Sequence, residues 1–97
     1  MFRTAMRDDD GMLFVYQQPQ ILTMWMRNTY IPLDMVFILQ GGSIEHVAAN
    51  TEPLSETVIS SQGPVLAVLE LKAGTARRLD LKPGDKVLSQ SLHTNQP

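Results

Sequence analysis

The sequence predicts a mainly β fold, either a small antiparallel barrel or a closed sandwich, with one short helix. Short runs of branched and aromatic residues recur along the 97 residues, separated by glycine, proline and polar residues. This pattern is typical of antiparallel all-β domains. The length fits a single domain over residues 1–97, and the polar residues 93–97 are expected to fray.

The first predicted strands lie in the N-terminal third. Met12 to Tyr16 is an apolar run rich in aromatic and branched side chains, which favours a strand. Gln17 to Gln20 contains a proline and is predicted to be a turn or loop. Ile21 to Arg27 is the second predicted strand. Because proline cannot donate a ladder hydrogen bond, Thr29 to Leu33 is expected to be a bend or an edge.

A hairpin is predicted in the middle of the chain. Asp34 to Leu39 is apolar at nearly every position, as in a strand buried on both faces. Gly41 and Gly42 follow it, and a glycine pair between strand-like runs is a strong hairpin signal. Ile44 to Ala49 is the predicted return strand, and Asn50 to Glu56 has the composition of a loop.

The C-terminal third supplies the remaining elements. Val65 to Leu71 is predicted to be a strand, because of its length and its flanking proline and glycine. Ala73 to Leu79 is the candidate helix, of about two turns. Lys82 to Asp85 contains proline then glycine at the central positions of a type II turn. Lys86 to Leu92 is predicted to close the domain as a strand.

Composition excludes several classes of function. The net charge of −2 argues against a nucleic-acid surface, which is normally basic. The absence of cysteine excludes disulfides, thiolate zinc sites and a cysteine nucleophile. His46 and His93 lack metal-ligand spacing, so neither a metal nor a cofactor is expected. The sequence contains no transmembrane run and no signal peptide.

The segment from Met24 to Met35 has the highest density of polar groups in an apolar setting. Buried polar groups need partners, so this density indicates a structural network or a ligand site. Alternation along the predicted strand places Trp25 and Arg27 on one face and Asn28 on the other. An arginine beside an indole is a natural stacking pair. Trp25, Arg27, Asn28 and Asp34 are therefore the candidate ligand-binding residues.

Two carboxylates in apolar surroundings are weaker candidates for catalysis. Asp34 precedes an apolar strand, and Glu70 lies between two leucines on the face of Leu66 and Val68. A structural ion pair would explain such burial, and Arg27 is the obvious partner for one of the two carboxylates. Alternatively, the two could face one cleft as a general acid–base pair, as in a hydrolase. The spacing of Asp34 and Glu70 in the sequence does not determine the distance between their carboxyl groups.

Several motifs resemble the DUF192 family of small bacterial and archaeal proteins. The matching segments, which cover nearly the whole chain in order, are Gly11–Tyr16, Trp25–Thr29, Ile31–Met35, Pro64 with Val68–Leu71, and Lys82–Asp85. The resemblance implies a β-rich domain, often preceded by a signal peptide or lipoprotein leader, and hence a periplasmic or otherwise exported protein. It also implies that an N-terminal leader and the first strand or strands are missing here. Val58 departs from the family pattern, which often has an aromatic residue at that place, and the family carries no established activity.

These observations leave several hypotheses about function. The first is a non-enzymatic binding module of the cell envelope that holds a small molecule, glycan or protein partner through the Trp25, Arg27, Asn28 and Asp34 patch. The second is a purely structural motif in an interaction domain. The third is an enzyme that uses Asp34 and Glu70. A missing strand would also leave a sheet edge open to pairing with a second copy of the chain, so a homodimer is a further candidate.

Overall fold

The computed structural model describes residues 11–27 and 29–87 and contains two antiparallel sheets and one short helix. A four-stranded sheet has the order β1-β6-β3-β4, and a two-stranded ribbon pairs β2 with β5. In chain order the elements are β1 (Gly11–Gln20), β2 (Thr23–Met24), β3 (Leu33–Ile38), β4 (Ile44–Thr51), β5 (Ile59–Ser60), β6 (Val65–Lys72) and α1 (Thr75–Arg78). The fold class is therefore mainly β, as predicted.

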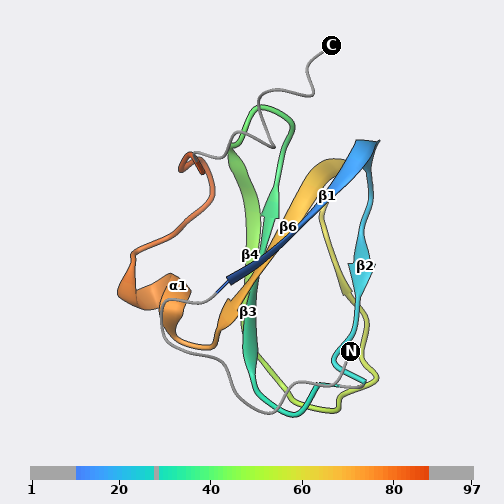
Figure 1. Cartoon of the computed structure of the whole chain (residues 1–97), viewed down its shortest axis with the longest axis vertical. Coiled ribbons are helices and arrows are strands. Elements are labelled where there is room, and N and C mark those ends of the chain that lie inside the picture. Colours follow the sequence, from blue (N-terminus) through green and yellow to red (C-terminus); the bar gives the residue numbers. More distant parts are fainter. Residues whose placement is uncertain (1–10, 28, 88–97) are drawn as a thin grey trace.

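The elements form layers around the four-stranded sheet. Figure 1 shows β2 on one side of this sheet and α1 on the opposite side. One hydrophobic cluster fills the space between sheet and ribbon, with Met26, Met35 and Phe37 fully buried within it. A second cluster lies on the α1 side and includes Val36 and Ile38. β3 thus contributes to both clusters, which is why all of its residues are buried.

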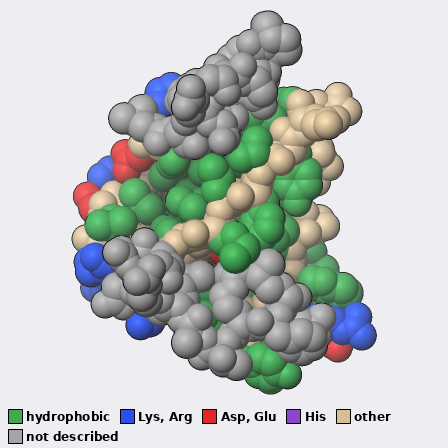
Figure 2. Space-filling view, viewed as in Figure 1, with side chains coloured by type: hydrophobic (Ala, Val, Ile, Leu, Met, Phe, Trp, Pro, Cys, Tyr) green, Lys and Arg blue, Asp and Glu red, His purple; other side chains and the backbone are tan. Residues whose placement is uncertain are grey.

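The face of the molecule seen in Figure 1 is apolar at its centre. Figure 2 shows hydrophobic side chains gathered over the middle of this face and charged side chains along the edges. Leu13, Val47 and Leu69 pack against the second cluster as partly buried side chains. A chain of this size cannot cover all of its apolar surface, so such exposure is ordinary.

The predicted hairpin is present and has the expected backbone geometry. Gly41 and Gly42 have φ angles of 96° and 101°, in the left-handed region that favours glycine. Leu39 N–H donates to the carbonyl of Ser43 at 2.8 Å, which closes the turn between β3 and β4. The turn at Lys82 to Asp85 is also confirmed, because Asp85 N–H donates to the Lys82 carbonyl and Gly84 has a φ of 94°.

The predicted barrel is wrong. The four-stranded sheet has β1 and β4 as its outer strands and does not close on itself, so the architecture is a small open sandwich. The predicted turn at Gln17 to Gln20 is also wrong, because β1 continues through these residues. Proline is tolerated in an outer strand, where its missing N–H removes no essential ladder hydrogen bond. The register of β1 on β6 is irregular between Val15 and Gln20.

Three further elements differ in length from their predictions. The strand predicted at Ile21 to Arg27 is reduced to Thr23–Met24. The predicted helix at Ala73 to Leu79 is reduced to Thr75–Arg78, about one turn. Of the last predicted strand, Lys86 forms an isolated bridge with Ser43, and the positions from residue 88 onward lie outside the described residues.

Side-chain hydrogen bonds fix the short ribbon at the residue that precedes β2. The buried Ser61 hydroxyl accepts a hydrogen bond from Leu22 N–H at 3.0 Å and donates to the Gly63 carbonyl at 2.8 Å. Ser61 N–H in turn donates to the Leu22 carbonyl. These bonds hold the start of β2 against the loop after β5, and so position the residues that follow β2.

Candidate functional site

The segment that contains Trp25 alternates between the core and the surface, as predicted. Leu22 and Met26 are buried, with exposed fractions of 4% and 0%, whereas Trp25 is 51% exposed. Trp25 and Arg27 share the outer side, and the guanidinium carbon of Arg27 lies 5.3 Å from the centroid of the indole ring. This distance is within the range of a cation–π contact. The predicted stacking pair is therefore present.

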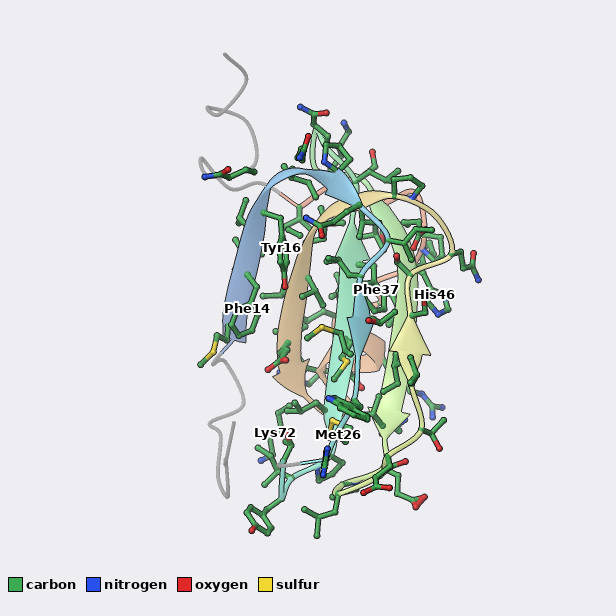
Figure 3. The ribbon with its side chains drawn as sticks, turned by 90° about the vertical axis from the view of Figure 1, so that its right-hand side faces the viewer. Phe14, Tyr16, Met26, Phe37, His46 and Lys72 are labelled. Atoms are coloured by element: carbon green, nitrogen blue, oxygen red, sulfur yellow. The ribbon has the colours of Figure 1, made fainter. Side chains whose placement is uncertain are left out.

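A cavity of about 320 Å³ opens beside this pair. Strand β1 supplies two aromatic side chains, the segment around β2 supplies most of the remaining wall, and β6 supplies one carboxyl group. The lining residues are Phe14, Tyr16, Thr23, Met24, Trp25, Arg27, Thr29 and Glu70. Figure 3 views the molecule from the β2 side and shows Phe14 and Tyr16 along the same strand. The volume lies at the lower end of the range of small-molecule sites, and the mixture of aromatic and charged side chains is typical of them.

The two charged groups of the cavity differ in exposure. Glu70 is 6% exposed, so its carboxyl group lies in surroundings that contain little water. The Arg27 side chain is 56% exposed and its Nε lies 3.9 Å from a carboxylate oxygen of the still more exposed Glu56. An ion pair at that distance and exposure is weak and is screened by salt. The cavity therefore combines an inner acidic group with an outer, partly neutralised cation.

A second hollow of about 230 Å³ adjoins the first. It is lined by Thr23, Met24, Trp25 and Val58. Thr23, Met24 and Trp25 line both hollows, whereas Arg27 and Glu70 line the first alone and Val58 lines the second alone. Val58 is itself 57% exposed.

Asp34 does not belong to this surface, contrary to the prediction that placed it in the ligand-binding patch. It is fully buried at the start of β3. One carboxylate oxygen accepts a hydrogen bond from Asn50 N–H at 2.9 Å, and the other accepts one from Ala76 N–H at 2.8 Å. Asp34 thus joins β3 to the end of β4 and to the first turn of α1. The helix gains a carboxylate acceptor at an N-terminus whose cap residue, Gly74, offers no side chain.

The two carboxylates lie on opposite faces of the sheet. Glu70 is paired with Met35, while Asp34 is paired with Leu71. Directly paired residues share a face and successive residues alternate. Asp34 therefore faces the α1 side and Glu70 faces the ribbon side. The hypothesis of an acid–base pair in one cleft is therefore wrong. The sequence did predict that both carboxylates are buried, but they are buried on different faces of the sheet.

Asn28, the fourth predicted ligand-binding residue, lies outside the described residues. The cavity instead includes residues that sequence analysis missed, namely Phe14, Tyr16, Thr23, Met24 and Thr29. Alternation within β1 could have placed Phe14 and Tyr16 on one face. Their position beside Trp25 depends on the pairing of β1 with β6, which connects distant parts of the chain.

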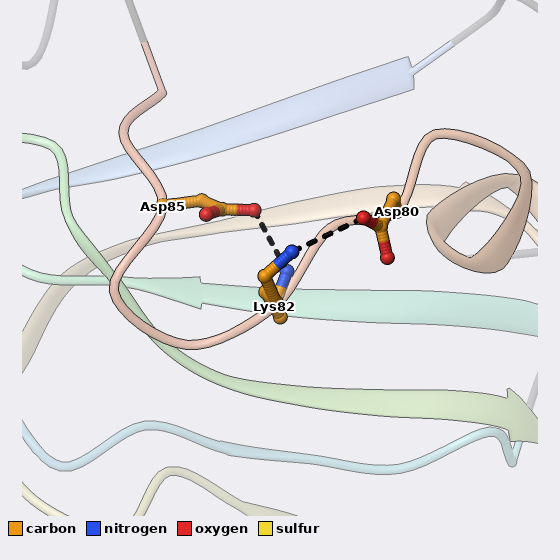
Figure 4. Close-up of polar contacts among 3 residues, drawn as sticks. All are labelled: Asp80, Lys82 and Asp85. Atoms are coloured by element: carbon orange, nitrogen blue, oxygen red, sulfur yellow. Dashed lines mark hydrogen bonds and ion pairs between the residues drawn. The ribbon is translucent and has the colours of Figure 1, made fainter.

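A second cluster of charges lies in the turn that follows α1. Lys82 Nζ lies 3.1 Å from a carboxylate oxygen of Asp80, and Lys82 N–H donates to the Asp85 carboxylate at 3.1 Å (Figure 4). The hydrogen bond that the Lys82 ammonium donates to the Asp80 carboxylate raises the pKa of Lys82 above its usual value, with further contributions from the charges of Asp80 and Asp85. The cluster borders no cavity described above and is a surface feature of the turn.

Neither a metal-binding cluster nor a membrane-spanning helix occurs in the residues that the structure describes. Within residues 11–27 and 29–87, no three histidine or acidic side chains lie close enough together to bind a metal ion. The helix found in these ranges is too short and too polar to span a bilayer.

Comparison with known proteins identifies relatives but no activity. The model of the DUF192 family, described as an uncharacterized ACR, matches residues 1–89. A crystal structure from Sinorhizobium meliloti 1021, named a "putative transcription regulator", is 46% identical, with a TM-score of 0.90. A protein of unknown function from Novosphingobium aromaticivorans DSM 12444 is 48% identical, with a TM-score of 0.88. The alignments cover 94% and 92% of this chain but 70% and 64% of those two chains, and no curated protein matches the sequence.

Proposed function

We propose that this chain, which belongs to the DUF192 family, is a binding module that holds a small molecule in the cavity beside Trp25. The observation that carries the proposal is the cavity of about 320 Å³ with aromatic walls and two charged side chains. A half-exposed tryptophan next to a cavity supplies a flat apolar surface, on which a sugar ring or another planar group can stack.

The exposure of Trp25 and Arg27 favours binding over a purely structural role for this part of the motif. A large aromatic side chain contributes most to stability when it is buried, and Trp25 keeps half of its surface open. The structural role falls instead to Asp34, which is buried and hydrogen-bonded to two backbone N–H groups. The motif that appeared continuous in sequence thus divides into a surface part and a buried part.

A thermal-shift screen with Trp25→Ala tests the proposal. Small molecules, including mono- and oligosaccharides, are screened for a rise in the Tm of the wild type. Because Trp25 is half-exposed, its removal leaves the core intact, and a cavity ligand should raise the Tm of the wild type but not that of Trp25→Ala.

Tyr30→Ala is the matched control for this screen. Tyr30 is similarly exposed, at 48%, and does not line the cavity. A cavity ligand should therefore stabilise Tyr30→Ala as it does the wild type. A ligand that stabilises all three proteins equally would place binding elsewhere, and a screen without stabilising compounds would count against the proposal.

The cellular context of this module is a separate proposal. Location in the cell envelope is supported by the family resemblance alone, and fractionation of cells that make the full natural protein would test it. The name of the Sinorhizobium relative suggests transcription instead. A net charge of −2 does not favour direct contact with DNA, which normally requires a basic surface.

A second copy of the chain is an additional candidate partner. β1 is an outer strand of the four-stranded sheet and carries an apolar run from Met12 to Tyr16. Outer strands of this kind present backbone groups that can pair with another strand. We propose that self-association, where it occurs, uses β1.

A further inference from the structure

We infer that the second hollow beside Trp25 is a subsite for the apolar part of the ligand, so that the ligand is amphipathic, with a neutral, hydroxyl-bearing head and a short alkyl chain. The head occupies the cavity of about 320 Å³, and the chain occupies the adjoining hollow of about 230 Å³. This inference rests on the proposed binding function and adds the chemical class of the ligand.

The two hollows share part of their walls. Thr23, Met24 and Trp25 line both, so a single ligand can extend from one hollow into the other. The second hollow is smaller than about 300 Å³, the lower end of the range of complete small-molecule sites. It therefore fits one part of a ligand better than a whole ligand.

The second hollow presents apolar surface that the fold leaves open to water. Val58 lines this hollow and is 57% exposed, and Trp25 is 51% exposed. Met24 adds an unbranched thioether side chain, which adapts its shape to a neighbouring group. Among the described residues, none that lines this hollow carries a charge. Covering such a surface with an alkyl chain removes apolar area from water, which favours binding.

The contact between Arg27 and Trp25 directs apolar groups to this second hollow. The guanidinium carbon of Arg27 lies over the indole ring, 5.3 Å from its centroid. Arg27 lines the first cavity and not the second. An apolar group in the first cavity therefore meets a ring face that is already covered, whereas Met24 and Val58 are available to it in the second hollow.

The first cavity suits a neutral head that carries hydroxyl groups. Its two charged side chains have opposite signs and are both engaged within the chain. Arg27 lies 3.9 Å from a carboxylate oxygen of Glu56, and Glu70 takes part in an interaction of its own. Neither charge thus requires a counter-ion from the ligand. The hydroxyl groups of Tyr16 and Thr23 can each donate or accept a hydrogen bond, which matches the hydroxyl groups of a sugar or polyol.

Three probes separate the head from the chain. Methyl β-D-glucoside supplies the head, 1-hexanol supplies the chain, and hexyl β-D-glucoside supplies both. Calorimetric titration measures each Kd, and the fluorescence of Trp25, the only tryptophan of the sequence, reports on binding at the two hollows. Since each fully buried CH₂ group tightens binding by up to about fourfold, we expect hexyl glucoside to bind about tenfold or more tightly than methyl glucoside. It should also bind more tightly than 1-hexanol.

The outcomes separate failure of this inference from failure of the proposed function. Equal affinity for methyl and hexyl glucoside would overturn the apolar subsite and leave a binding cavity in place. Equal affinity for 1-hexanol and hexyl glucoside would overturn the hydroxyl-bearing head. Absence of binding by all three probes would overturn this inference, whereas the wider thermal-shift screen decides the proposed function.

Val58→Thr tests whether the chain occupies the second hollow. The variant nearly keeps the shape of the side chain and places a hydroxyl group against the alkyl chain, at an exposed position whose change leaves the core intact. The ratio of the affinities for hexyl and methyl glucoside should fall by about threefold or more. Methyl glucoside should bind as it does to the wild type. A preserved ratio would overturn the assignment of the chain to this hollow.

Val15→Thr and Tyr16→Phe are the matched controls. Val15, which is 37% exposed, lines neither hollow, so the same substitution there should keep the wild-type ratio. Tyr16→Phe removes a hydroxyl group from the first cavity alone and should change the affinity for both glucosides by the same factor. A ratio that falls in either control as far as in Val58→Thr would overturn the division of the ligand between the two hollows.

Discussion

Asp34 is the residue whose removal should affect stability most directly. In Asp34→Asn an amide NH₂ replaces one carboxylate oxygen, so either Asn50 N–H or Ala76 N–H loses its acceptor. Because the site is fully buried, the free energy of unfolding should fall by about 1–3 kcal/mol, the cost of an unsatisfied buried group. Urea denaturation of wild type and variant measures the difference.

The same variant also tests the separation of Asp34 from the cavity. Where it remains folded, Asp34→Asn should be stabilised by a cavity ligand as the wild type is, since Asp34 faces the other side of the sheet. Glu52→Gln, at an exposed position, should leave stability nearly unchanged. Unchanged stability together with lost binding in Asp34→Asn would return Asp34 to the ligand site.

The burial of Asp34 could be predicted from its sequence neighbours, but its partners could not. Apolar residues on both sides indicate a buried strand, and a buried carboxylate must have hydrogen-bond donors. The donors are backbone N–H groups 16 and 42 positions away in the chain. No residue type marks them, because any non-proline residue can supply a backbone N–H.

The elements whose conformation is determined by neighbouring residues in the sequence were predicted best. The inward and outward sides around Trp25 follow from the two-residue period of extended chain, which persists even though only Thr23 and Met24 form a regular strand. The glycine pair sets the β3–β4 hairpin for a similarly local reason. The extent of β1 was missed because Pro19 is a breaker in most contexts, and only its place in an outer strand makes it acceptable.

The turn after α1 has a pH dependence that can be measured at one residue. The pKa of Lys82 is raised above 10.5 chiefly by its hydrogen bond to Asp80. A pKa that is higher in the folded than in the unfolded state stabilises the fold at pH values below the unfolded value. This contribution is lost as the pH rises through the folded pKa, above 10.5. It is small because the side chains are exposed.

Asp80→Asn tests this assignment by lowering the pKa of Lys82 toward 10.5. Asparagine tolerates the left-handed backbone of this position, which has a φ of 56°, so the turn should be kept. NMR titration of the Lys82 side chain measures the change, and 1 M salt should reduce the difference between the two proteins. Identical titration curves would show that Asp80 does not determine the pKa.

At the scale of the whole molecule, the contacts that define the cavity are long-range. Glu70 lies opposite Met12 because β1 pairs with β6, which places Phe14 and Tyr16 beside Trp25. The sequence pattern predicted β1, β3, β4 and β6 in order and a longer form of β2, but it predicted neither β5 nor which outer strands meet. A barrel requires pairing between β1 and β4, and no local pattern specifies which outer strands meet.

The place of β1 as an outer strand among the described residues leads to a prediction about assembly. The run from Met12 to Tyr16 in β1 has no charged side chain to discourage pairing with another strand. We therefore expect the chain to self-associate with rising concentration in sedimentation velocity. Val15→Lys, at a position 37% exposed on β1, should shift the protein toward monomer, because a lysine on an edge strand disfavours pairing.

Leu79→Lys is the matched control for this variant. It adds the same charge at an exposed site beyond α1 and should leave association unchanged. A wild type that sediments as a monomer at all concentrations, or equal effects of the two lysines, would contradict pairing through β1.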